Sequence, residues 1–303
     1  MPSMPRDRAA PVGSIPSVAI VVRRRRALRR ALVASRRVGR AWMEAGVLAP
    51  TLEASARRAR GAVLAAGVLQ ALEVGIVRRG VPRFPDGATL VVANHVSWLD
   101  ACVLQAVLPA RLVVAAELAT VPVLGRICRG FDAILVRPGD VRDARRTVAE
   151  IAGALRAGER VLVFPESVPT DGRRVGRFHA ALLQAAVETG APVQPVALRW
   201  LGVGGRPTSA VARLGERRRG ASLLGVLAAP YLRAEVRVGP PLSVAGRTRR
   251  ELAALAERFV AASLGLTPVR SEPELGPDAR DRRPPRASAF RRSRFGRLVP
   301  AWS

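Results

Sequence analysis

The stretch LVVANHVSWLDACVL, Leu90 to Leu104, joins the end of a strand to the start of a helix. Its opening run of Leu, Val and Ala is typical of a strand, which we expect to end at Ala93. His95, one of only two histidines in the chain, follows this strand, and Asp100 comes five residues later. Because α/β folds place ligands and catalytic groups at the carboxyl edge of the sheet, the stretch predicts a candidate site at His95.

The spacing between His95 and Asp100 leaves two interpretations open. Five residues of continuous helix rotate the chain by roughly 140°, which would point the two side chains apart. A strand-to-helix turn can instead fold the carboxylate back onto the imidazole, fix its tautomer and leave the other ring nitrogen free to take a proton from a hydroxyl. Alternatively, Asp100 only caps the helix or pairs with an arginine, which is the commoner outcome for an isolated H-x4-D pattern.

After Pro85, short runs rich in Val, Leu and Ile alternate with longer amphipathic runs. The predicted strands cover about 88–93, 112–116, 132–137, 160–164, 193–199 and 232–238. The predicted helices cover about 98–108, 141–156, 176–188 and 247–263, with Asp140 as the N-cap of the second. This alternation predicts an α/β fold, a mainly parallel sheet flanked by helices.

The composition points to an anionic partner. The net charge is +27 and the sequence contains no lysine, so every cationic side chain is an arginine. Guanidinium groups bind phosphates and carboxylates bidentately, although a bias in genomic base composition would produce the same content without any function. The two cysteines suggest neither a disulfide framework nor a metal site, and we expect no metal and no cofactor.

The N-terminal region has a pattern of its own. Arginines alternate with apolar residues from Ser17 to about Ala45, as in a basic amphipathic helix on an anionic membrane surface or folded onto the protein. The apolar run 61–77 predicts an in-plane or shallowly inserted helix rather than a transmembrane one, with a buried core helix as the alternative. We therefore expect a helical membrane-associating segment over 17–80. The Pro-rich residues 1–16 and the basic tail 269–303 are predicted to be disordered.

Three further motifs follow Asn94-His95-x4-Asp100, whose fuller form N-H-x-S-x-x-D includes Ser97. In order, they are GFDAILVR at 130–137, VFPES at 163–167 and APVQPVALRW at 191–200. With these four motifs the chain resembles the lysophospholipid acyltransferases, the family that includes the 1-acylglycerol-3-phosphate acyltransferases. The resemblance covers about 80–240 and implies a glycerolipid acyltransferase-like domain over 81–268.

The resemblance implies roles for individual residues. His95 would be the general base, Asp100 its orienting partner, and Arg137 and Glu166 the binders of the acceptor head group. It also implies that Asn94, Ser97, Ser167 and Pro195 belong to the substrate-binding motifs. The co-substrates would be acyl-CoA or acyl-carrier protein and a lysophospholipid.

The third motif departs from the family pattern. Ser167 stands where glycine is usual, and Pro169 replaces an arginine found in many members. Arg173, Arg174 or Arg177 could supply the missing phosphate ligand, or their segment could be a solvated basic loop. In the second motif Asp132 occupies a glycine position. These departures concern the acceptor more than the catalysis.

The expected protein is therefore an O-acyltransferase on the cytoplasmic face of a bacterial inner membrane. We expect lysophosphatidic acid as the acceptor, with an ornithine-type lysolipid as the alternative. An alternative of another class is a non-catalytic membrane- or nucleic-acid-binding protein built on a decayed acyltransferase fold. The intact first motif argues against it, and we do not expect nucleic acid as a partner. For His179, the second histidine, we expect a packing or helix-terminal role.

Overall fold

The computed structural model describes residues 17–81, 85–137, 141–166, 169–212 and 219–267. The predicted disordered ends and the predicted N-cap Asp140 lie outside these ranges. The helices are α1 (Ser17–Val47), α2 (Ala54–Ala71), α3 (Trp98–Val107), α4 (Pro122–Gly130), α5 (Val141–Arg156), α6 (Gln184–Thr189), α7 (Arg219–Ala228) and α8 (Arg249–Leu264). The strands are β1 (Val74–Gly80), β2 (Thr89–Ala93), β3 (Arg111–Ala115), β4 (Ile134–Val136), β5 (Arg160–Val163), β6 (Val193–Leu201) and β7 (Leu232–Val238). Short 3-10 turns are η1 (Ala49–Thr51), η2 (Ala116–Thr120), η3 (Ala181–Leu183) and η4 (Val203–Gly205).

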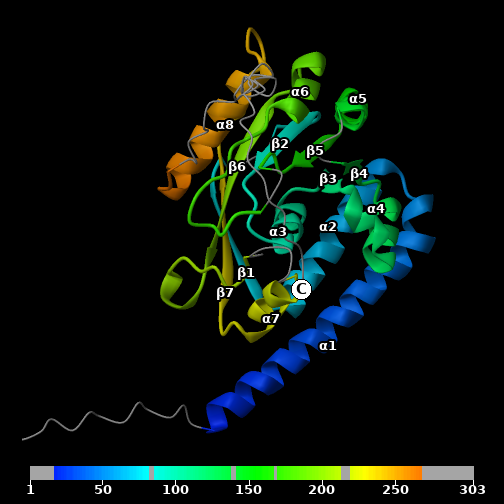
Figure 1. Cartoon of the computed structure of the whole chain (residues 1–303). Coiled ribbons are helices and arrows are strands. Elements are labelled where there is room, and N and C mark those ends of the chain that lie inside the picture. Colours follow the sequence, from blue (N-terminus) through cyan, green and yellow to red (C-terminus); the bar gives the residue numbers. More distant parts are fainter. Residues whose placement is uncertain (1–16, 82–84, 138–140, 167–168, 213–218, 268–303) are drawn as a thin grey trace, which may run out of the picture. The chain divides into compact units, whose positions relative to one another are not determined.

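Within the described residues, seven strands form one sheet in the order β1-β7-β6-β2-β5-β3-β4 (Figure 1). Strand β2 lies between β6 and β5 and is parallel to both, and β3 and β4 continue the parallel set. Strand β7 is antiparallel to β6, and β1 is parallel to β7. The predicted fold class is confirmed, and β2 ends at the edge of the sheet where its parallel neighbours also end.

Strand β2 is buried along its whole length, which explains its continuous apolar sequence. Leu90 and Val92 belong to the core formed with α5, α6 and α8. Val91 and Ala93 belong to the core formed with α2, α3 and α7. Because successive side chains point to opposite faces of a sheet, this one short strand anchors both layers. Figure 1 shows the two sets of helices on either side of the sheet.

Helix α1 packs against α2, α4 and α7, and one buried side chain bonds it to the end of α7 and to Glu73, which follows α2. Arg30 is 1% exposed. Its Nη1 donates to the carbonyls of Leu227 (3.3 Å) and Ala229 (2.6 Å), at the C-terminal end of α7, and its Nη2 donates to Glu73 Oε2 at 2.9 Å. Burial lowers the pKa of Arg30, and the carboxylate and helix-end carbonyls compensate its charge.

The predicted helix over 61–77 is wrong at its C-terminal end. Helix α2 stops at Ala71, and Glu73 takes a left-handed conformation with φ of 56°. The next residues include three β-branched side chains and form β1, which pairs with β7. Residues 74–80 of the predicted helical segment are therefore a strand of the sheet. Among the described residues, every helix is too short or too polar to cross a membrane.

The helix predicted over 176–188 begins later, with η3 at 181 and α6 at 184. Three amides before that point donate to distant parts of the chain instead of to a helix. Those of Gly176 and His179 bond to the turn after β5, and that of Phe178 bonds to Glu257 on α8. The remaining predicted elements are confirmed to within two residues at each end, whereas α4 and α7 were not predicted.

Candidate active site

A capping box forms the turn between β2 and α3. Ser97 is the N-cap of α3, and its Oγ accepts from the amide of Leu99 at 3.4 Å. Asp100, the third residue of the helix, accepts in return from the amide of Ser97 at 2.7 Å. A capping box satisfies amides that would otherwise be left without partners at the start of a helix. A strand-to-helix turn therefore lies between His95 and Asp100. This is the geometry that allows the carboxylate to fold back onto the imidazole.

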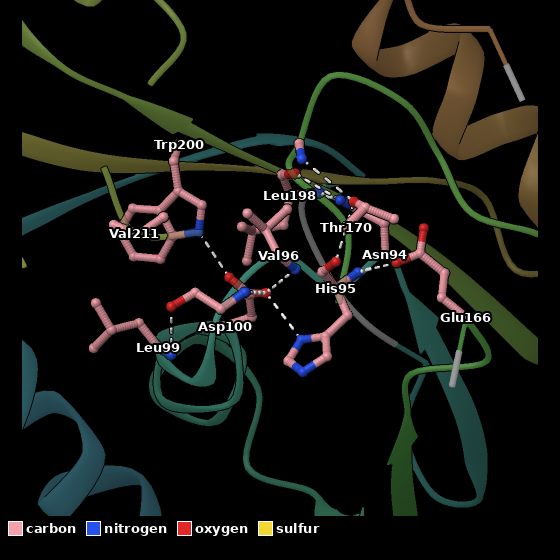
Figure 2. A network of polar contacts seen from close by, with 12 residues as sticks. Asn94, His95, Val96, Leu99, Asp100, Glu166, Thr170, Leu198, Trp200 and Val211 are labelled. Carbon is pink, nitrogen blue, oxygen red and sulfur yellow. Dashed lines mark hydrogen bonds and ion pairs between the residues drawn. The ribbon is translucent and has the colours of Figure 1, made fainter. Parts of the chain in front are cut away.

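Asp100 caps the helix and also holds the imidazole. Its Oδ2 lies 3.0 Å from His95 Nδ1 and accepts from the amide of Val96 at 2.6 Å, while its Oδ1 accepts from Trp200 Nε1 at 2.7 Å. The carboxylate is 0% exposed. Because an ionised carboxylate only accepts hydrogen bonds, this arrangement favours the His95 tautomer that carries its proton on Nδ1. Figure 2 shows the other ring nitrogen pointing away from Asp100.

The His95 ring is partly accessible. Its side chain is 19% exposed. One face stacks on Phe164, with the ring centroids 4.3 Å apart. Within the described residues, no hydrogen bond reaches Nε2. The ring is thus held on one edge and one face, and Nε2 is left as a proton acceptor that a substrate hydroxyl could reach.

The backbone of His95 is held by the turn that follows β5 (Figure 2). Its amide donates to Glu166 Oε2 at 2.6 Å. Its carbonyl accepts from the amide of Thr170 at 2.8 Å and from the Thr170 hydroxyl at 3.3 Å. The third motif therefore supports the first, although some 70 residues of sequence lie between them.

Glu166 is buried, with 6% exposed. Burial raises the pKa of its carboxyl to about 7, against the opposing effect of the amides of His95 and Gly176. Its second oxygen, Oε1, accepts from Gly176 at 2.7 Å. Both oxygens thus bond to the backbone, an arrangement that favours a positioning role over the predicted contact with the acceptor head group.

Three other predicted binding residues are buried. Asn94 is 3% exposed, and its amide group exchanges two hydrogen bonds with the backbone of Leu198 on β6, at 3.0 and 2.8 Å. Ser97 is 0% exposed, and Pro195 lies inside β6 beside Val92 of β2. These side chains fix the backbone around His95, so their positions favour structural roles rather than contact with a substrate.

Arg137 lies at the same edge of the sheet as His95, directly after β4. Three strand spacings, β2-β5-β3-β4, place it roughly 14 Å away across the sheet. Its amide donates to Asp143 Oδ2 at 3.0 Å, and the residue is exposed. The role of Arg137 in binding the acceptor head group stays a prediction.

The residues that depart from the family pattern are only partly described. Ser167 lies outside the described residues. Arg173, Arg174 and Arg177 are exposed, which leaves both predictions for their segment open. Asp132 has φ of 52°, a conformation that favours glycine, and its side chain forms an ion pair with Arg57 on α2.

A cavity of about 420 Å³ lies between α1, α2, α3, α4 and α7. Its lining is apolar almost throughout, and it includes Trp42 on α1, Val123 on α4 and Leu227 on α7. Trp98, three residues after His95, also lines it. The cavity therefore adjoins the turn that carries His95. Among the described residues, no group of three or more His, Cys, Asp or Glu side chains is placed to hold a metal ion.

Sequence reasoning missed three residues of the site: Phe164, Thr170 and Trp200. Phe164 and Trp200 lie inside the third and fourth motifs, but the family resemblance assigns roles to other residues of those motifs. Trp200 could have been singled out because a tryptophan buried in a sheet needs an acceptor for its N–H. The sequence pattern contains no comparable signal for Thr170.

The profile of the Acyltransferase family matches residues 76–199. The chain is 37% identical over 147 residues to a 1-acyl-sn-glycerol-3-phosphate acyltransferase of Neisseria meningitidis, which covers 48% of this chain and 57% of that protein. The chain thus aligns with little more than half the length of this relative. It is 34% identical to a lyso-ornithine lipid O-acyltransferase of Brucella abortus, covering 63% of this chain and 74% of that protein.

The fold also matches a solved structure. The crystal structure of the 1-acyl-sn-glycerophosphate acyltransferase PlsC from Thermotoga maritima aligns with a TM-score of 0.62 at 19% identity. The alignment covers 81% of this chain and 96% of that one. At this identity the likeness supports the fold, and the sequence relatives support the family.

Proposed function

The chain belongs to the acyltransferase family, and we propose that it transfers a fatty acyl group from a thioester to the hydroxyl of a lysophospholipid, with His95 as general base. One observation carries the proposal. The His95 ring is fixed through Nδ1 by a buried carboxylate, and Nε2 is left without a partner among the described residues. This is the arrangement that a base needs in order to activate a hydroxyl.

In the proposed reaction, Nε2 of His95 takes the proton as the acceptor oxygen attacks the thioester carbonyl. The new C–O bond forms a tetrahedral intermediate, whose collapse breaks the C–S bond. The imidazolium then returns the proton to the departing thiolate. Asp100 stays ionised throughout and stabilises the imidazolium. The thioester supplies an activated acyl group, so the scheme uses no protein nucleophile.

The proposed acceptor is lysophosphatidic acid, with Arg137 as a ligand of its phosphate. A guanidinium binds phosphate through charge-assisted, bidentate hydrogen bonds. A lyso-ornithine lipid is the second candidate, because two relatives named lyso-ornithine lipid O-acyltransferase align over 74% and 69% of their lengths. The donor is acyl-CoA or acyl-carrier protein, both of which are anionic and suit the basic surface.

The proposed place of action is an anionic membrane surface, at the cytoplasmic face of a bacterial inner membrane. Val21, Leu28, Leu32 and Met43 are exposed by 48–73% and recur at helical spacing along one side of α1. Arginines flank this apolar stripe. Such a helix lies in the interface with its apolar side in the lipid and its cations at the head groups. We propose that an acyl chain enters the apolar cavity beside it.

The test is acyl transfer by purified protein, with labelled acyl-CoA or acyl-carrier protein and a panel of lysophosphatidic acid and lyso-ornithine lipid. We expect labelled two-chain lipid, and a loss of at least about 10²-fold in His95→Ala. The matched control is His179→Ala, which removes the other, exposed histidine and should retain full activity. Equal rates for wild type and His95→Ala would overturn the assignment of the base. Lipid binding without any acyl transfer would favour the non-catalytic alternative.

A further inference from the structure

Trp200 bonds to the carboxylate that holds the proposed base. It lies on β6, far from the first motif in sequence, and its indole N–H donates to Asp100 Oδ1 at 2.7 Å (Figure 2). Trp200 is 2% exposed and Asp100 is 0% exposed. The indole has one polar atom and no acceptor, so its burial requires a partner, and the carboxylate is that partner.

The two carboxylate oxygens of Asp100 bond to different partners. Oδ2 faces His95 Nδ1 and the amides of Val96 and Ser97, whereas Oδ1 accepts from Trp200 alone among the described residues. Without the indole N–H, Oδ1 would be a buried charged oxygen with no partner among the described residues. The negative charge on Oδ1 would then lack a hydrogen bond to stabilise it, and the carboxylate would be less firmly fixed in rotation about Cβ–Cγ.

We propose that Trp200 is a positioning residue, which acts on His95 through Asp100. The indole N–H fixes the plane of the carboxylate so that Oδ2 meets Nδ1. It also withdraws charge from the carboxylate, which limits how strongly Asp100 retains the proton on the imidazolium. A base that must return this proton to the leaving thiolate benefits from that limit. This inference rests on the proposed function for its effect on rate, but not for its effect on His95.

Two further ionisable side chains, Glu166 and Cys102, lie near the pair of His95 and Asp100. Glu166, from the turn after β5, bonds to the His95 amide, and Cys102 on α3 interacts with Asp100. Burial is the first cause that raises the pKa of the Cys102 thiol to about 12, which keeps it neutral near pH 7. Both groups are retained in the variants below.

The test uses Trp200→Phe, which keeps an aromatic ring in the core and removes the N–H. Val211→Ala is the matched control. Val211 is fully buried in the same apolar cluster as Trp200, so its truncation loosens the packing but leaves the hydrogen bond intact.

The first readout is NMR titration of His95 in a His179→Ala background, where His95 is the only histidine. We expect Trp200→Phe to move the titration midpoint of His95 upward by roughly 0.5 pH unit or more, because the negative charge of the carboxylate is no longer shared with the indole N–H and acts more strongly on the imidazolium. Val211→Ala should leave it in place. An unchanged midpoint in Trp200→Phe, or an equal change in both variants, would overturn the inference whether or not the protein transfers acyl groups.

The second readout is the pH profile of acyl transfer. We expect Trp200→Phe to lower kcat by about 10-fold with little change in KM, and to shift the acid limb of kcat/KM in the same upward direction. Wild-type protein without activity would count against the proposed function alone. An active Trp200→Phe variant with an unshifted profile would count against the role of Trp200 alone.

Discussion

The residues that hold His95 and the surface around it are built in different ways. Asp100, Glu166 and Asn94 are at most 6% exposed, and all their side-chain oxygens accept hydrogen bonds from inside the protein. Arg137 and the apolar stripe of α1 are exposed instead. In the first region the buried side-chain oxygens find their partners inside the protein. The second region presents donors and apolar surface that a lipid would cover. Substitutions in the base network should therefore change the chemical step, and substitutions on the surface should change binding.

The largest effect is expected inside the network. Asp100→Asn removes the charge that stabilises the imidazolium and turns one acceptor into a donor facing buried N–H groups. We expect kcat to fall by about 10³-fold in the acyl transfer assay. Asp86→Asn, on a fully exposed carboxylate, is the control and should behave as wild type. If Asp100→Asn retains activity while its melting temperature is unchanged, the orienting role of Asp100 is wrong.

At the surface, Arg137 should affect the acceptor and leave the base unaffected. Arg137→Ala should lower kcat/KM for lysophosphatidic acid by about 10-fold or more, mostly through KM, because a charge-assisted hydrogen bond to phosphate is lost. Arg156→Ala, an exposed arginine at the C-terminal end of α5, is the matched control. A fall in kcat at saturating acceptor would show that Arg137 acts in the chemical step. The expected difference between the two regions would then be wrong.

The stripe on α1 should affect only attachment. Leu28→Glu/Leu32→Glu should weaken binding to anionic vesicles by about 10-fold in a flotation assay, because two leucines no longer enter the lipid. Arg258→Gln/Ala262→Glu makes the same change in net charge on α8, which packs on the other face of the sheet. Equal loss of binding in both variants would show that net charge, and not the stripe, holds the protein to the vesicle.

The smallest expected effect concerns stability. The pKa of Glu166 is raised from 4.5 to about 7, so the folded protein retains a proton that the unfolded chain has already lost. The resulting contribution to stability is present below about pH 4.5 and is lost as pH rises through 7. Between pH 5 and 8, the unfolding free energy of wild type should therefore fall relative to that of Glu166→Gln, by on the order of 2 kcal/mol.

Urea denaturation at each pH measures the effect, with exposed Glu188→Gln as the control. If the unfolding free energy of wild type instead rises relative to that of Glu166→Gln as the pH increases, the sign of the pKa shift is wrong. Such a result would mean that the two amides that bond to Glu166 outweigh its burial.

Much of the α/β domain could be predicted from the sequence because its signals are local. The apolar run of β2 and the periodic α5 each follow from neighbouring residues, and so does the capping box of α3. The failures have non-local causes. The segment after α2 is a strand because β7 lies beside it, and residues 176–180 are not helical because their amides bond to distant groups.

The sequence by itself determined which residues are available for chemistry: one strand-end histidine, an aspartate five positions on, and three ordered motifs after them. The tertiary structure decided what those motifs do. It turned Glu166 and Asn94 toward the backbone, brought Thr170 to the carbonyl of His95, and set Trp200 against Asp100. The physical reason is that a buried polar atom must find a partner, and in a parallel sheet the nearest partner comes from a neighbouring strand that lies far away in the sequence.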